Sequence, residues 1–280
     1  MRRVTLPARP KRRRRRERGK SSPMERDRKS GEELEEKPFL EHLEDLRRVF
    51  LKIFVSWGAA SLVAFLLSGP LFVAVQWPLS RIVSEVSARN QEFILRTLSP
   101  PEAFLMSIKI ALLAGFIVTL PLILYFSARF LSPALKPVEK RYLVPTFSLG
   151  GVLFFFGVFF AYGVVLPLSL RFFWMYTERL GIRPEWTLQH YISLVGKLLL
   201  GFGLVFELPV IILLLSALGI LNYDMLKRKR PYVVVGIFIL AALFTPPDVI
   251  TQVLMAVPLL ILFEACLFLS RFISSRRSGL

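Results

Sequence analysis

The sequence has few of the residues that build disulfides, metal sites or hydrolytic active sites. It contains one cysteine, Cys266, so an intrachain disulfide is impossible. Its two histidines, His42 and His190, lack the further ligands that a metal site needs. The chain has no GxSxG or HExxH motif, and neither histidine has a nucleophile at a recognisable spacing. We therefore expect no catalytic residues, no metal, no cofactor and no enzyme activity.

Acidic residues are also scarce, whereas apolar residues are abundant. The chain has 20 Asp and Glu against 37 Lys and Arg, a net charge of +17, and 54% of its residues are hydrophobic. A soluble domain of this length could not bury so many apolar side chains, so we expect an all-α integral membrane protein. No segment has the pattern of a cleavable signal peptide, and we expect the first apolar span to target the chain to the membrane.

Much of the positive charge lies near the N-terminus. Residues 1–37 are rich in arginine and then in glutamate, with almost no large apolar residues, so we expect a disordered cytoplasmic tail. The run from Lys11 to Arg18 could indicate nucleic-acid binding. Attraction to anionic lipid head groups, or a true start at Met24, explains the run better, and we expect no nucleic-acid partner.

Apolar segments of suitable length predict six transmembrane helices within residues 38–272, followed by a short basic cytoplasmic tail at 273–280. Crossing the hydrocarbon core takes roughly 20 residues. The fifth segment would be only about 21 Å long as a helix, which predicts local thinning of the bilayer. Residues 71–98 mix apolar and charged side chains and predict an interfacial loop. The expected spans are about 49–68, 103–130, 143–170, 190–218, 232–245 and 249–270.

Loop charges predict the orientation. If there are six spans, the basic clusters after spans two, four and six all fall on the side of the basic tail. The positive-inside rule then places both termini in the cytoplasm. These clusters contain Lys136, Lys140, Arg141, Lys227, Arg228, Lys229, Arg230, Arg271, Arg276 and Arg277.

The segment Phe39–Phe54 joins the polar tail to the first span. Its apolar residues recur every three or four positions, which predicts an amphipathic helix. Its other face carries Glu41, Glu44 and Asp45. Such a carboxylate cluster at a cytoplasmic membrane boundary is unusual in so basic a chain. We interpret it as the first half of a binding site for a positively charged group.

Several ordered motifs together resemble those of TatC, the multi-span receptor subunit of the twin-arginine translocase. The resemblance covers roughly residues 38–272. The motifs are FLEHLEDLRR before the first span, SPPEAF (99–104), FLSPALKPVEKR (130–141), FAYGVVLP (160–167), FGLVFELPV (202–210), RKRPYVVVG (228–236) and TPPDV (245–249).

The resemblance implies a Sec-independent protein translocase subunit. It would bind twin-arginine signal peptides of folded precursors and recruit TatA-type subunits for export driven by the proton-motive force. It also implies a concave, glove-like arrangement of six helices with a short fifth and sixth. Expected partners are the signal peptides, TatA-type and TatB-type single-span subunits, membrane lipid and further copies of the chain, in the bacterial inner membrane.

The resemblance associates acids at Asp45 and Glu139 with binding of the arginine pair. Arginine stays charged and is best held by carboxylates that accept forked hydrogen bonds. Asp45 departs from the family's usual glutamate, so Glu44 could share its role, and Phe130 matches a position on the same surface. Simpler alternatives are helix-surface pairing of the first acids with Arg48, worth a few tenths of a kcal/mol, a solvated Glu139 and an ordinary interfacial Phe130.

Glu207 is an acidic residue in the interior of the expected apolar span 190–218. A carboxylate there is costly and normally faces a cavity or a partner. The resemblance implies a groove that contacts a partner helix, whereas the alternative is a hydrogen bond that only shapes the fold. Tyr162, Pro78 and Asp248 also match family positions tied to activity, although structural roles suit them equally well.

Two other function classes remain open at this point. A secondary transporter or channel would place Glu207 on an ion path, but the sequence shows no internal repeat. A structural scaffold for other membrane subunits would not need acids at two cytoplasmic edges.

Overall fold

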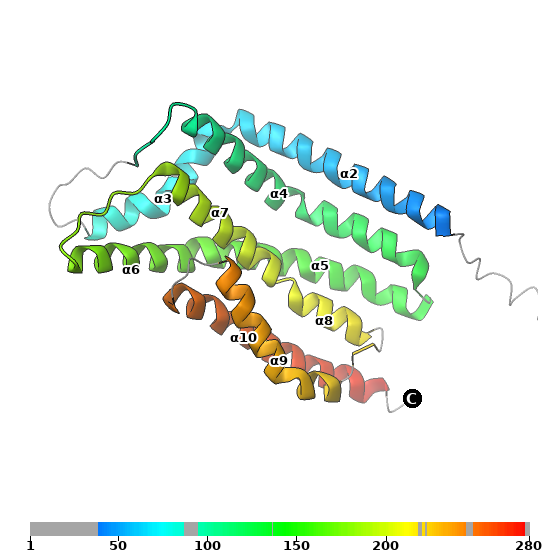
Figure 1. Cartoon of the computed structure of the whole chain (residues 1–280). Helices are drawn as coiled ribbons and strands as arrows, with labels where there is room; N and C mark the ends of the chain where they lie inside the picture. Colours follow the sequence, from blue (N-terminus) through cyan, green and yellow to red (C-terminus); the bar gives the residue numbers. More distant parts are fainter. Residues whose placement is uncertain are drawn as a thin grey trace, which may run out of the picture. The chain divides into compact units, whose positions relative to one another are not determined.

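The computed structural model describes residues 39–86, 95–135, 137–217, 220–221, 223–244 and 249–277. The chain divides into a unit up to Glu44 and a unit from Asp45 onward. Almost every described residue is helical (Figure 1). The helices are α2 (Phe39–Leu66), α3 (Ser68–Val86), α4 (Glu102–Leu131), η1 (Ser132–Ala134), α5 (Pro137–Phe160), η2 (Ala161–Val165), α6 (Leu166–Arg179), α7 (Leu188–Val205), α8 (Leu208–Ala217), α9 (Tyr223–Phe244) and α10 (Val249–Arg277).

Five helical segments in the described part of the chain are long and apolar enough to cross a membrane. They are Leu43–Leu66, Glu102–Leu131, Leu143–Arg179, Leu188–Ser216 and Val249–Phe268. The expected fifth span falls in α9, which is not among them. Because α9 carries a basic cluster at 227–230 near its start, only a short apolar part of the helix remains.

Helices α5 and α7 pack side by side through glycine positions on both helices (Figure 1). A Cβ added at Gly157 of α5 would lie 2.8 Å from the Phe202 carbonyl oxygen of α7. A Cβ added at Gly203 would lie 2.5 Å from the ring of Phe154 on α5. Small residues let transmembrane helices approach closely. Both Phe154 and Phe202 are fully buried here, so this crossing forms the centre of the core.

Helices α2 and α4 are antiparallel neighbours. The Trp57 indole nitrogen donates to the Leu112 carbonyl at 3.1 Å, and the Phe65 and Phe104 rings meet edge to face. Where the helices cross, a Cβ at Gly115 would lie 2.8 Å from the Ser61 Cα. At 1.5 Å per residue, Asp45 lies about 24 Å before Ser61 and Phe130 about 22 Å after Gly115. The two residues are therefore at the same end of this helix pair.

A π-helical segment, η2, separates α5 from α6. The Leu166 N–H donates to the Ala161 carbonyl, one residue further back than in an α-helix. Pro167 follows at the start of α6 and cannot donate an N–H itself. A π segment therefore lies just before this proline.

Residues 68–86 differ from the expected interfacial loop because they form the helix α3. Leu79 and Ile82 are buried in the core, and α3 packs against α4 and α6. Pro78 lies in the interior of this helix and is fully buried. Between α2 and α3 only Leu67 is outside a helix, and Gly69 and Pro70 belong to the first turn of α3. Tertiary packing thus stabilises a helix that the local sequence does not favour.

Helices α9 and α10 also pack together. Arg230 of α9 and Glu264 of α10 form an ion pair at 2.6 Å, and both side chains are about half exposed. The Gln252 amide donates to the Phe238 carbonyl at 3.1 Å. Cys266 of α10 is buried, as expected of a small apolar side chain.

Candidate functional site

The acids expected to bind arginine begin on α2. Asp45 is half-buried and Glu44 is exposed. Arg47 and Arg48, which follow directly, are exposed. This stretch precedes the apolar part of the helix, so its charged side chains lie where a membrane-spanning helix meets the aqueous phase.

The second group of residues lies where α4 ends and α5 begins. Phe130 is in the last turn of α4 and is half-buried. Glu139 is in the first turn of α5, and its side chain is outside the described part of the structure. Helices α4 and α5 pack against each other, and only residues 132–136 link them. Asp45 and Phe130 lie at the same end of α2 and α4, and α5, which carries Glu139, begins at that end. The three segments that carry the predicted binding residues are therefore at one end of these helices.

Glu207 occupies a break between two helices. It follows α7 and precedes α8, and Pro209 occupies the second position of α8. The Glu207 carbonyl accepts hydrogen bonds from the N–H groups of Val210 and Ile211, at 3.0 and 3.1 Å. The break therefore retains most of its backbone hydrogen bonds, while the side chain turns into the protein.

The Glu207 carboxylate is buried, with 9% of the residue exposed. Its Oε1 is buried without a hydrogen-bond partner among the residues that the structure describes. On α5 the carboxylate faces a glycine, because a Cβ added at Gly150 would lie 2.7 Å from Oε2. A buried acceptor without a partner is costly, so Glu207 has the capacity to accept a donor from a group that enters this site.

Pro78 and Tyr162 contact the same turn of α3. Proline has no N–H, so Pro78 leaves the Ala74 carbonyl without its helical donor, and its ring disturbs the preceding turn. The Tyr162 hydroxyl donates to the Ala74 carbonyl at 2.6 Å, and the Tyr191 hydroxyl donates to the Val75 carbonyl at 2.6 Å. The contacts assign these two candidates a structural role inside the chain.

Trp77, next to Pro78, extends this contact toward the surface. Its ring stacks on Tyr162 at 6.3 Å between centroids, and the Arg81 guanidinium lies 5.6 Å from the Trp77 ring centroid. Trp77 is half-exposed. Asp248, the remaining candidate, is outside the described residues.

Glu102 is a buried carboxylate whose partners the sequence did not reveal. Only 4% of the residue is exposed. Its Oε2 accepts from the N–H groups of Leu98 and Ser99 at 2.6 and 3.3 Å, and its Oε1 accepts from the Gln189 N–H at 2.9 Å. The sequence indicated an acid suited to the first turn of α4. Its one hydrogen bond to the start of α7, from the Gln189 N–H, joins residues 87 positions apart in the sequence.

Neighbouring backbone bonds reinforce this junction. Arg96 pairs with Thr187 in an isolated β-bridge, and the Arg96 side chain forms an ion pair with Glu185 at 3.0 Å. Nearby, Lys109 of α4 donates to the Ser193 hydroxyl of α7 at 2.7 Å. The loop before α4 and the start of α7 are therefore held together by several polar contacts.

The described residues also lack the ligand sets that metal ions need. Among the residues that the structure describes, no group of three or more His, Cys, Asp or Glu side chains is placed to hold a metal ion. His190 instead lies 2.6 Å from the Thr187 hydroxyl, which caps α7.

Comparison with protein families matches residues 41–258 to the model of "Sec-independent protein translocase protein (TatC)". The chain belongs to the TatC family. It is 37% identical to the Sec-independent protein translocase protein TatC of Aquifex aeolicus, over 86% of this chain and 97% of that protein. It is 40% identical to the TatC of Akkermansia muciniphila, over 68% of this chain and 55% of that protein.

A solved structure agrees with this assignment. The chain resembles the "Crystal Structure of Twin Arginine Translocase Receptor- TatC" with a TM-score of 0.72 and 37% identity, over 83% of this chain and 99% of that one. The all-helical fold of the TatC family is thus confirmed. The family is one of protein-transport components, which decides against an enzyme and against a secondary transporter or channel.

Proposed function

We propose that this chain is the receptor subunit of a twin-arginine translocase in a bacterial inner membrane. It binds the signal peptides of folded precursors at its cytoplasmic face and recruits TatA-type subunits for export driven by the proton-motive force. Either a separate TatB-type subunit or a TatA-type subunit that serves both roles, together with further copies of the chain, completes the receptor complex. Family membership carries this proposal, and the solved relative is itself described as a twin-arginine translocase receptor.

The proposed topology has six membrane helices with both termini in the cytoplasm. Residues 1–37 form a cytoplasmic tail, 38–272 the concave, glove-like membrane domain and 273–280 a short basic tail. The apolar part of α9 supplies a short fifth span and α10 the sixth. The basic residues near the start of α9 and the acids near the start of α2 then face the cytoplasm, in keeping with the positive-inside rule.

The proposed receptor site combines Asp45, Glu139 and Glu44 with Phe130. The antiparallel packing of α2 on α4, and the short link from α4 to α5, support the combination. Two carboxylates from different helices can each accept hydrogen bonds from one guanidinium of an arginine pair, which an ammonium of lysine cannot match in geometry. Phe130 offers an apolar surface beside them.

The proposed partner site is the buried Glu207, whose Oε1 has no hydrogen-bond partner within the described residues. A hydrogen-bond donor on a single-span partner helix that reaches this carboxylate would satisfy it. Tyr162, Pro78 and Asp248 complete the set of family positions assigned to the groove or to partner contact, and Tyr162 and Pro78 also determine the shape of α3.

Site-specific photocrosslinking of a twin-arginine signal peptide to the full-length protein in membranes tests the receptor site. The compared proteins are the wild type, Asp45→Ala, Glu139→Ala and the conservative Asp45→Glu. Glu178→Ala serves as the matched control, because Glu178 is an exposed acid near the end of α6.

We expect crosslinks near residues 45 and 139 in the wild type, Asp45→Glu and Glu178→Ala. They should be lost in the two alanine variants at the candidate site and with a twin-lysine peptide. A crosslink that is indifferent to both acids and to the arginines would rule out the assigned site.

A further inference from the structure

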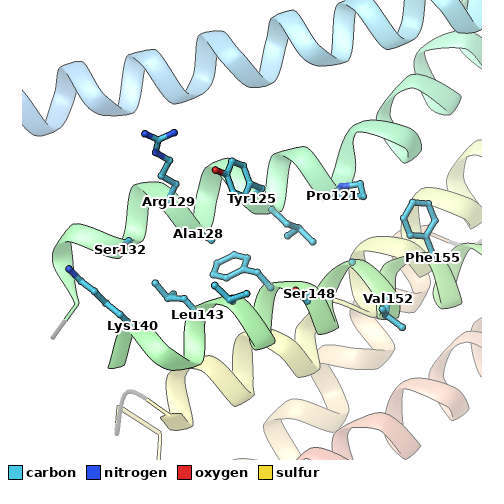
Figure 2. A pocket seen from close by; sticks show the side chains of 14 residues that line it. Pro121, Tyr125, Ala128, Arg129, Ser132, Lys140, Leu143, Ser148, Val152 and Phe155 are labelled. Atoms are coloured by element: carbon cyan, nitrogen blue, oxygen red, sulfur yellow. The ribbon is translucent and has the colours of Figure 1, made fainter. Parts of the chain in front are cut away.

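A groove of about 680 Å³ lies between the second half of α4 and the first half of α5 (Figure 2). Its size is within the range of about 300–1,000 Å³ that is typical of ligand sites. Most of its lining is apolar, including Leu124, Leu143, Val144, Phe147, Val152 and Phe155. The two helices belong to the candidate spans Glu102–Leu131 and Leu143–Arg179, so the apolar part of the groove lies within the membrane.

Polar groups gather at the end of the groove where α4 ends and α5 begins. Arg129 comes from the last turn of α4, Lys140 from the first turn of α5, and Ser132 from the link between them (Figure 2). The Tyr125 hydroxyl is turned toward this end as well. The groove is thus amphiphilic along its length, with a cationic end and an apolar body.

Arg129 and Lys140 are both exposed, and neither has an ion pair among the residues that the structure describes. The dipole of α4 favours the cation Arg129 at the C-terminal end of that helix. The dipole of α5 disfavours the cation Lys140 at the N-terminal end of α5. An anion between the two side chains would compensate both charges. Basic pockets between transmembrane helices at the membrane surface attract anionic head groups in this way.

We propose that this groove binds one anionic phospholipid of the adjacent leaflet. Its phosphate is held by Lys140 at the end of the groove, within reach of the Ser132 and Tyr125 hydroxyls, and an acyl chain follows the apolar body of the groove. The Arg129 side chain, which extends from α4 away from α5 in Figure 2, turns toward the same phosphate when the lipid binds. The apolar segment of a twin-arginine peptide is the less suitable occupant, because no Asp or Glu is among the described residues that line the groove. The lipid site does not depend on the receptor function proposed above.

Native mass spectrometry of the full-length protein in detergent tests the proposal. Phosphatidylglycerol and phosphatidylcholine with identical acyl chains are titrated in parallel. Two cations near a head group predict a preference for phosphatidylglycerol on the order of tenfold. The double variant Arg129→Gln/Lys140→Gln should lose this preference. The matched double variant Arg179→Gln/Arg183→Gln, which removes two exposed arginines elsewhere, should keep it.

A second variant tests the apolar body. Gly151 lines the groove, and a Cβ there would meet only Leu124 Cδ1, at 3.9 Å, so the backbone tolerates a side chain. Gly151→Leu should reduce binding of both lipids severalfold without altering the preference between them. Thermal melting of every variant verifies that the protein remains folded.

Equal binding of the two lipids by the wild type, or the same loss of preference in both double variants, would overturn the proposal. Free glycerol phosphate should not displace the lipid, and displacement at comparable concentration would indicate a simple anion site instead. Displacement by a twin-arginine peptide that crosslinks to residue 151 would identify the groove as a peptide site and would equally overturn the proposal.

Discussion

Glu102 and Glu207 are two buried carboxylates near opposite ends of α7, and the hydrogen bonds that they accept differ greatly. Glu102 accepts three backbone N–H groups, one of them at the start of α7. Glu207, about 27 Å further along the helix axis, has an Oε1 without a hydrogen-bond partner in the described part of the chain.

The difference separates two uses of the same chemical group. A buried carboxylate that accepts several backbone N–H groups fixes the fold, because its removal leaves those donors unsatisfied. A buried carboxylate with an open acceptor costs free energy, and such a cost is retained where a partner completes the site. We therefore assign Glu102 to the scaffold and propose a functional role for Glu207.

Glu102→Ala should have the largest effect on stability. It removes three hydrogen bonds to a charged acceptor, each worth about 1.5–3 kcal/mol, and leaves buried donors unsatisfied. We expect the free energy of unfolding in detergent to fall by about 3–5 kcal/mol. Glu185→Ala, which breaks only the exposed ion pair with Arg96, is the control and should cost less than about 1 kcal/mol. Equal costs would remove the distinction between the two carboxylates.

Gly150→Ala should cause the next largest decrease in the free energy of unfolding. Its Cβ would lie 2.7 Å from Glu207 Oε2, so the carboxylate or the helix has to move, at about 1–3 kcal/mol. Gly151→Ala is a matched control, because its Cβ would make only an ordinary contact at 3.9 Å. The cost of Gly150→Ala, measured as the free energy of unfolding, should largely disappear in a Glu207→Ala background. A cost that persists there would indicate a clash with the helix rather than with the carboxylate.

Tyr162→Phe should cost about 1 kcal/mol, the usual contribution of one hydrogen bond. The hydroxyl donates to the Ala74 carbonyl, which Pro78 deprives of its helical donor. In a Pro78→Ala background the restored N–H can satisfy that carbonyl, so the same substitution should cost less. A double-mutant cycle of unfolding free energies measures this coupling. Additive effects would show that the proline and the tyrosine act independently.

Glu207→Gln should have the smallest effect on stability and a large effect on function. It removes a charge that is costly to bury, so the free energy of unfolding should change by less than about 1 kcal/mol. Crosslinking of a TatA-type subunit to the helix break should nevertheless fall severalfold. A loss of stability as large as that of Glu102→Ala would instead assign Glu207 to the scaffold.

Local sequence patterns predicted five of the six expected spans at the positions where the described residues form long apolar helices, because hydrophobic length and charged boundaries are local properties. The carboxylate of Glu207 inside an apolar span was evident from the sequence, whereas the helix break at this residue was not predicted. The helix through Pro78 could not be predicted locally, since two tyrosines from distant segments donate to the Ala74 and Val75 carbonyls of the preceding turn. The hydrogen bond of Glu102 to the start of α7 escaped prediction for the same reason.

The binding affinity of a twin-arginine peptide for the full-length protein tests the central claim most directly. A double-mutant cycle compares the wild type, Asp45→Ala, Glu139→Ala and the double variant, with a twin-lysine peptide in parallel. We predict that each single variant binds the twin-arginine peptide at least about tenfold more weakly than the wild type, equivalent to about 1.4 kcal/mol. Replacing the peptide's arginines by lysines should weaken binding to these variants little further. Unchanged affinity in both single variants, or equal affinity for the twin-lysine peptide, would contradict the claim that these acids hold the arginine pair.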